Sequence, residues 1–200
     1  MCGTHPGSPG VGQPIVSFRE LQVELATRET FAPYGALVGA DPKLAARTGQ
    51  FYGDKVELWS PGPFRSDEDT CLSVARVHLR APQVLWMERH FKHTQTFIPL
   101  GGAPLVMVLG APTADHQPNP DTVRAFSFDG SSGVMLHVGT WHEFPFASRP
   151  PADVVVILRK ETQSNLEVRE NDEAVGDDLE KRNLQARLGF GFTYTVGSGR

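Results

Sequence analysis

A series of short apolar runs, each followed by a turn-rich separator, is the feature that most constrains the fold of this chain. Several runs alternate apolar and polar residues, as strands with one buried face do. Strands that recur every ~8–12 residues between turn signals are typical of a β-sandwich or a β-barrel. No helix long enough for the crossover between parallel strands is predicted among them. The runs are residues 50–59, 72–79, 83–88, 95–99, 105–109, 123–128, 133–138 and 154–158.

Glycine and proline make up much of the separators. The 20 glycines and 16 prolines are 36 of 200 residues, or 18%, against about 12% in average usage. This excess disfavours helical bundles and coiled coils, which keep both residues out of element interiors. Four glycines and three prolines fall in residues 1–14, so we expect a disordered leader there.

The two ends flank a single predicted domain over residues 15–166. It begins with strand-like residues 15–23, then a short helical turn near Thr30 and a strand over 36–38. Residues 167–200 form a C-terminal extension. Within it, residues 177–188 open with acids and end with bases before Gly189, which predicts a helix that packs on the barrel. Residues 190–196 could add one more strand.

Charge and cysteine content restrict the partners. The net charge is −4 and no basic stripe stands out, so we expect no nucleic-acid partner. No run of 18 apolar residues predicts a membrane span. Two cysteines, Cys2 and Cys71, do not make a disulfide framework, and the N-terminus has no secretory signal pattern. A reducing, cytoplasmic location is the simplest interpretation.

Histidines and acids gather in two short windows. Of the 7 histidines, four lie in residues 88–97 and 133–146. In the first window Glu88 and His90 are two apart, so on a strand they share a face. Gln95 follows five residues after His90, and Gly102 stands seven after Gln95, where a tight turn is expected. In the second window Gly139 permits a turn before His142.

This spacing resembles the two motifs of the cupin superfamily. The first cupin motif reads H-x-H, then three or four residues, Glu, six residues and Gly. Here Glu replaces the first His and Gln replaces the Glu. The second motif reads P-x-G-x-x-H, and His137 stands here at its first position. The resemblance implies an all-β fold, an antiparallel barrel (double-stranded β-helix) with short helices. It also implies that four residues face the mouth of the barrel, namely Glu88, His90, Gln95 and His142.

These four residues are the predicted ligands of a divalent metal ion, if one is bound. Because the Gln95 amide is neutral, we expect weaker metal binding than three histidines and a glutamate would give. The remaining window residues have ordinary structural interpretations. Arg89 should point away from Glu88 into a surface ion pair. His93 should be exposed, and Cys71 should be a buried small apolar residue.

A closer resemblance lies within that superfamily. Four phrases of the sequence look like the ureidoglycolate lyase family, which is also called ureidoglycolate hydrolase. They are ERH at 88–90, TQTFIP at 94–99, RAF at 124–126 and GVMLHVGTWH at 133–142. The resemblance covers roughly residues 15–166. It implies cleavage of (S)-ureidoglycolate into glyoxylate and urea, a late step of allantoin and purine nitrogen recovery, and it implies a homodimer.

That reaction would need three kinds of group. A base must take the proton of the C2 hydroxyl, an acid must protonate the leaving urea nitrogen, and a cation must hold the carboxylate. Gln95 could hydrogen-bond the ureido group, and Arg76, or with less support Arg124, could hold the carboxylate. The spacing does not separate the roles of the proton-transfer candidates, which are Glu88, His90, His137 and His142.

Two other functions fit the same residues. The weakened ligand set would also suit a cupin module that binds or senses a small molecule without turnover. A different metal-dependent cupin enzyme, such as an isomerase or a dioxygenase, is the third reading. Product formation from ureidoglycolate separates the first function from the second, and metal analysis with oxygen uptake identifies the third.

Overall fold

Two β-sheets form the body of the protein in the computed structural model, which describes residues 16–167 and 172–195. The expected leader at 1–14 lies outside the described residues. The larger sheet runs in the order β15 (Ala174–Val175), β16 (Leu179–Asn183), β7 (Trp86–His90), β12 (Trp141–His142), β9 (Leu105–Gly110), β10 (Arg124–Phe128), β1 (Phe18–Leu25), β17 (Gly191–Thr195) and β6 (Gln83–Val84), with β13 (Phe146–Ala147) also on β9.

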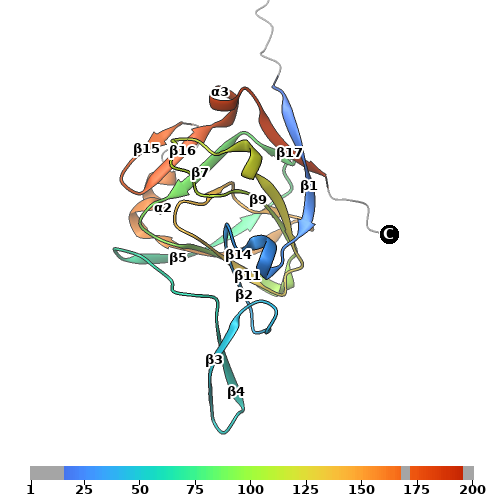
Figure 1. Cartoon of the computed structure of the whole chain (residues 1–200), viewed down its shortest axis with the longest axis vertical. Coiled ribbons are helices and arrows are strands. Elements are labelled where there is room, and N and C mark those ends of the chain that lie inside the picture. Colours follow the sequence, from blue (N-terminus) through green and yellow to red (C-terminus); the bar gives the residue numbers. More distant parts are fainter. Residues whose placement is uncertain (1–15, 168–171, 196–200) are drawn as a thin grey trace, which may run out of the picture.

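The smaller sheet faces the larger one and completes the barrel (Figure 1). Its order is β2 (Gly35–Val38), β11 (Gly133–Leu136), β8 (Gln95–Pro99), β14 (Ala152–Arg159) and β5 (Thr70–Val77). Pairing is antiparallel within this sheet. The predicted all-β, cupin-like fold class is confirmed. Short helices connect or flank the strands, namely α1 (Arg28–Phe31), α2 (Lys160–Glu167), α3 (Leu184–Leu188) and the 3-10 turns η1 (Leu100–Gly102) and η2 (Pro120–Thr122).

A hairpin of β3 (Ala46–Phe51) and β4 (Val56–Ser60) extends away from the barrel (Figure 1). The sequence predicts one run over residues 50–59, and this prediction is wrong. A turn with positive φ at Tyr52, Gly53 and Asp54 divides the run, because these residues reverse the chain between two strands.

Two apolar cores lie on opposite faces of the larger sheet. Strand β9 is buried along its whole length, and its side chains alternate between the cores. Leu105, Met107 and Leu109 pack into the core between the sheets. Val106 and Val108 pack into the second core, which includes residues of α3 and β17. The second core is therefore completed by the C-terminal segment.

The helix predicted over residues 177–188 is wrong in its first half. Residues 179–183 form strand β16, which pairs antiparallel with β7, and only residues 184–188 are helical. Gly189 ends α3 with φ of 82°, and β17 supplies the predicted final strand. Pairing with β7 and burial of Leu179 outweigh the helical preference of the acidic-to-basic pattern. Among the described residues, no helix has the length and apolar character needed to cross a bilayer.

Candidate active site

Two neighbouring strands present the central side chains of the site. Glu88 and His90 are two apart on β7, so they share one face, while Arg89 between them points to the other. On β12, His142 lies directly opposite Glu88 in the ladder. The turn before β12 includes Gly139 with φ of 83°, and its N–H donates to the His90 carbonyl at 2.7 Å. The local turn therefore fixes where His142 meets β7.

Glu88, His90 and His142 converge within reach of one ion. Glu88 Oε1 lies 3.5 Å from His142 Nε2 and 3.9 Å from His90 Nε2. The two imidazole rings are 5.1 Å apart. One potential ligand atom from each of the three residues lies within 4.8 Å of the other two. The structure thus brings together three of the four predicted metal ligands.

The hydrogen bonds of His142 show what this cluster is suited to bind. His142 Nδ1 lies 3.0 Å from the Thr140 carbonyl, which can only accept, so Nδ1 carries a proton. Nε2 lies on the other side of the ring, 3.5 Å from Glu88 Oε1. Nε2 of His142 and both nitrogens of His90 are buried without a partner among the described residues. A metal ion or a proton held between Glu88, His142 Nε2 and one nitrogen of His90 would give these facing atoms a partner.

Burial and neighbouring charges set the protonation states of the site. Burial, assisted by His142, lowers the pKa of His90 to about 3, so its ring is neutral at pH 7. Burial disfavours the Glu88 carboxylate, but the close contact with His142, together with His90 and Lys181, outweighs burial and lowers the Glu88 pKa. Burial raises the pKa of Glu143. The positive charge of Arg80 lowers it, but by less than burial raises it. The site therefore pairs an ionised carboxylate with a neutral imidazole ligand.

His93 belongs to the same cluster, contrary to the expectation that it is exposed. Its ring is buried and stacks on His90 at 4.6 Å. His93 Nδ1 lies 3.1 Å from Asp178 Oδ2, and Asp178 also accepts from Thr162 and from the Lys92 backbone N–H. Burial works against the Asp178 carboxylate, but the hydrogen bonds from His93 and Thr162 hold its pKa well below the usual range. Asp178 thus fixes the orientation of His93.

A pocket of about 330 Å³ opens beside the Glu88–His142 pair. Its size suits a small organic acid. Apolar side chains and four ionisable groups share its wall. The lining residues are Trp86, Met87, Glu88, His142, Glu143, Phe144, Leu166 and Lys181.

The structure places the other predicted site residues in different surroundings. Gln95 is buried at the start of β8, and its Oε1 has no partner among the described residues. His137 is exposed, with Nε2 3.2 Å from the Ala32 carbonyl. Arg76 makes a two-pronged ion pair with Asp153 at 2.8 and 2.9 Å. Arg124 pairs with Glu24. Neither arginine lines the pocket of Glu88.

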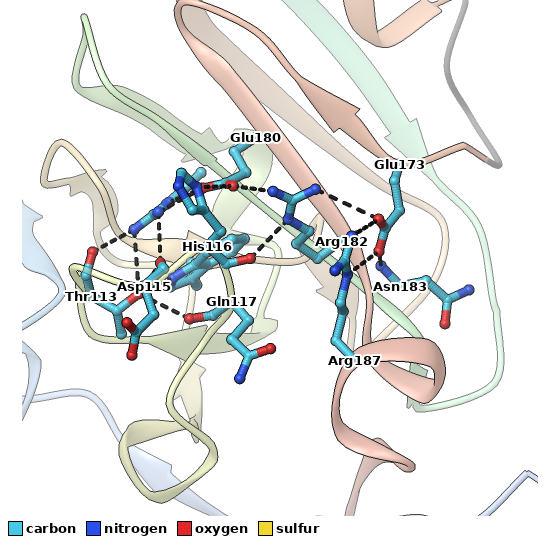
Figure 2. Close-up of polar contacts among 11 residues, drawn as sticks. Thr113, Asp115, His116, Gln117, Glu173, Glu180, Arg182, Asn183 and Arg187 are labelled. Carbon is cyan, nitrogen blue, oxygen red and sulfur yellow. Dashed lines mark hydrogen bonds and ion pairs between the residues drawn. The ribbon is translucent and has the colours of Figure 1, made fainter.

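Behind β7, a buried ionic network joins the C-terminal segment to the barrel (Figure 2). Arg89 is 3% exposed and contacts Glu180 at 2.6 Å, so the expected surface ion pair is a buried one. His116 Nδ1 lies 2.8 Å from the same Glu180 carboxylate, and Arg182 contacts it as well. The Arg89 guanidinium also lies 4.4 Å from the ring of Trp141. The network therefore packs against β7 and β12 on the face opposite Glu88 and His142.

Four site residues were missed by reasoning from the sequence. Glu143 and His93 lie within the two windows but off the cupin spacing. Asp178 directly precedes β16 and Lys181 lies on it, some ninety residues after β7 in the chain. Only the pairing of β16 with β7 brings them to the site, and no local signal in the sequence predicts that pairing.

Comparisons with known proteins identify the family of the chain. The family model described as ureidoglycolate lyase matches residues 18–176. A ureidoglycolate lyase of Burkholderia cepacia is 32% identical over 154 residues, which cover 72% of this chain and 82% of the relative. One of Pseudomonas fluorescens (strain SBW25) is 32% identical, covering 74% and 89%. One of Pseudomonas aeruginosa (strain LESB58) is 30% identical, covering 74% and 88%. The chain therefore belongs to the ureidoglycolate lyase family.

Proposed function

We propose that this protein is a lyase that cleaves (S)-ureidoglycolate into glyoxylate and urea. Family membership supports the reaction class. The observation that carries the proposal is the convergence of Glu88, His90 and His142 on the wall of a pocket sized for a small organic acid. In the cell, the reaction would serve the recovery of nitrogen from allantoin and purines.

The chemistry requires one proton to leave an oxygen and one to arrive at a nitrogen. The C2 hydroxyl loses its proton, its electron pair forms the carbonyl of glyoxylate, and the C–N bond breaks. The leaving nitrogen takes up a proton and becomes urea, so the net proton count is unchanged. Where the site holds no metal ion, we assign the Glu88–His142 pair to the hydroxyl proton. Glu143 is the second carboxyl group on the pocket wall, and we assign it to the leaving nitrogen.

A divalent metal ion fits the donor set of the site. Glu88, His90 and His142 would hold it, since their buried ligand atoms lie close together and the imidazole nitrogens lack partners among the described residues. Gln95, with its unpartnered amide oxygen, is the proposed fourth ligand or a hydrogen-bond partner of the ureido group. Bound there, a metal ion would act as a Lewis acid toward substrate oxygens. His90 is neutral at pH 7, as such ligation requires.

The decisive experiment incubates the purified full chain with (S)-ureidoglycolate, with and without added Ni²⁺ or Mn²⁺. Glyoxylate and urea should appear in equal amounts, well above the spontaneous background. A folded protein that gives no rate above background under any metal condition would refute the proposal. Stabilisation by ureidoglycolate without product would instead identify a binding module. Oxygen uptake with stoichiometric iron would identify a different metal-dependent enzyme.

We further propose that the protein works as a cytoplasmic homodimer. The free thiol of Cys71 supports a reducing compartment. For the dimer, strand β5 lies at the edge of the smaller sheet and exposes Leu72 and Val74. An apolar edge strand of this kind is suited to pair with a second copy of the chain.

A further inference from the structure

A second pocket, of about 350 Å³, lies on the outer face of the smaller sheet. Its wall includes Met135 of β11. The neighbours of Met135 on the strand, Val134 and Leu136, pack into the core between the sheets, so Met135 points to the outer face. The pocket shares no lining residue with the one beside Glu88. It is therefore a separate cavity with no part in the proposed reaction.

The charge on the wall of this pocket is positive. Arg65 lines it, and none of the described lining residues is an aspartate or a glutamate. Other pockets of the described chain have acids on their walls, for example Glu20 and Glu24 in the pocket beside β1. The arginine is thus unopposed here, although the net charge of the chain is −4. The local charge favours an anion as the ligand.

The guanidinium of Arg65 lacks a protein partner because the acids that follow it in the chain bind elsewhere. Asp67 and Glu68 both contact Arg159, at 2.8 and 2.7 Å. Among residues 16–167 and 172–195, no hydrogen bond, ion pair or ring contact involves the Arg65 side chain. Its N–H groups can therefore form the two parallel hydrogen bonds that a guanidinium makes with a carboxylate.

The loop that carries Arg65 is held in place without a ligand. The Arg65 N–H donates to Thr94 Oγ1, and the Arg65 carbonyl accepts from the Thr94 N–H, both at 2.9 Å. Two prolines of the loop, Pro61 and Pro63, line the same pocket, and their rings restrict the backbone. Ligand binding would then order only the arginine side chain, which limits the entropy lost.

From these observations we propose that the pocket binds a small monocarboxylate with an apolar body. One guanidinium matches a single negative charge, whereas a phosphate group with a charge of about −1.5 to −2 would stay partly unbalanced. Met135 and Val138 offer apolar contact to a hydrocarbon or aromatic body. The site goes beyond the proposed function, since it does not depend on cleavage of ureidoglycolate.

Methionine methyl NMR separates this pocket from the catalytic one. Of the 4 methionines, Met135 lines this pocket and Met87 lines the pocket beside Glu88. Benzoate, titrated into the full chain with isotope-labelled methionine methyl groups, should shift the Met135 signal to saturation, and Met135→Leu assigns that signal. Benzamide has the shape of benzoate without the charge, and acetate has the charge without the ring. Both should bind at least about 10-fold more weakly than benzoate.

Substitution of the arginine tests which group holds the carboxylate. Arg65→Gln should weaken benzoate binding at least about 10-fold, and Arg65→Lys should retain part of it. Arg149→Gln makes the same chemical change at another exposed arginine, in the turn before β14, and should bind benzoate like the wild type. Thermal unfolding of each variant verifies that it is folded.

Three results would overturn the inference. They are an unchanged benzoate titration in Arg65→Gln, benzamide binding as strong as that of benzoate, and benzoate shifts confined to Met87. Inorganic phosphate that binds through Arg65 more tightly than benzoate would show a phosphate site and would equally overturn the carboxylate assignment. None of these measurements requires turnover of ureidoglycolate, so their outcome is independent of the proposed function.

Discussion

At the scale of single residues, His90 shows how burial prepares a side chain for ligation. An exposed histidine is partly protonated near neutral pH, and a proton competes with a metal ion for its nitrogen. Burial lowers the pKa of His90 to about 3 and removes that competition. The neighbouring rings of His93 and His142 make a charged His90 still less favourable, because protonated rings would repel one another.

His142 should be essential for turnover and dispensable for folding. Its Nε2 faces Glu88 and has no other partner among the described residues. Replacing His142 with alanine should therefore lower kcat by about 10²–10⁴-fold, the usual contribution of a positioned acid–base group. The far-ultraviolet circular dichroism spectrum should be unchanged. Ni²⁺ or Co²⁺ should also bind more weakly, as measured by calorimetry.

The same substitution at other histidines provides the comparison. His78→Ala changes an exposed side chain at the end of β5 and should retain full turnover. His137→Ala tests the last predicted proton-transfer residue. Because His137 lies at the surface against the Ala32 carbonyl, this variant should also retain turnover. Near-normal kcat in folded His142→Ala would remove His142 from the mechanism.

The sequence predicts site residues where short-range periodicity controls their position. Glu88 and His90 were identified because two-residue spacing on a strand puts side chains on one face. The match of Gly139-x-x-His142 to the second cupin motif predicts His142. Arg76 and Arg124 were selected by charge alone, and charge does not reveal a partner such as Asp153. Lys181 could not be selected, since its position depends on a strand pairing between distant segments.

At the scale of elements, β16 shows how tertiary contacts override local preference. Its residues Glu180, Lys181 and Arg182 suit an exposed helix, yet all three are buried in a strand. The edge of β7 supplies hydrogen bonds to the backbone, and Arg89 and Arg182 neutralise Glu180. The helix forms only where these partners end, capped by Asn183 at its start and by Gly189 at its close. Gly189 predicts the end of α3 correctly, whereas the acidic-to-basic pattern places the beginning of the helix too early in the chain.

The link between β15 and α3 should make stability depend on pH. Glu173 accepts from Arg187 Nε at 2.9 Å and from the Asn183 backbone N–H at 3.1 Å (Figure 2). The hydrogen bond from Arg187 is the main cause that lowers the Glu173 pKa from 4.5 to about 2. The folded state therefore holds this carboxylate ionised at pH values where the unfolded chain protonates it. Its stabilisation is complete above pH 4.5 and is lost as the pH falls toward 2.

Urea unfolding of the wild type and Glu173→Gln across this pH range measures the effect. The wild type should be more stable by about 1 kcal/mol at pH 7, because solvent screens a partly exposed pair. The difference should shrink between about pH 4.5 and pH 2. In an Arg187→Met background, the same comparison should show little dependence on pH. A difference between wild type and Glu173→Gln that stays constant down to pH 2 would contradict the assigned contact.

At the scale of the whole molecule, the C-terminal segment packs into the barrel as an integral part of it. Leu184 and Phe192 are fully buried in the second core, and Glu180 holds Arg89 behind the site. Burying a charge pair of this kind is costly, and removal of one partner leaves the other charge uncompensated. The segment thus closes a core, neutralises buried charge and supplies Asp178 and Lys181 to the site. The pairing of β16 with β7 therefore contributes both to the stability of the molecule and to the set of residues that line its pocket.

The outer face of the smaller sheet is the expected dimer interface. Leu72 and Val74 on edge strand β5 are 68% and 57% exposed, and they pair across the ladder with Ile157 and Val155 on β14. These four side chains make a continuous apolar strip beside an unpaired strand edge, which a second copy of the chain would cover. The double variant Leu72→Lys, Val74→Lys places two charges on that strip in each copy.

Light scattering coupled to gel filtration should find a dimer for the wild type and a monomer for the double variant. Both positions are exposed, so the free energy of unfolding of the monomer should change by only about 0.5 kcal/mol. Val175→Lys changes a similarly exposed valine, 68% accessible, on edge strand β15 of the larger sheet and should leave the dimer intact. Dissociation by Val175→Lys alone would move the interface to the other sheet. A wild-type monomer at micromolar concentration would mean that each barrel works alone, with a site completed entirely by its own C-terminal segment.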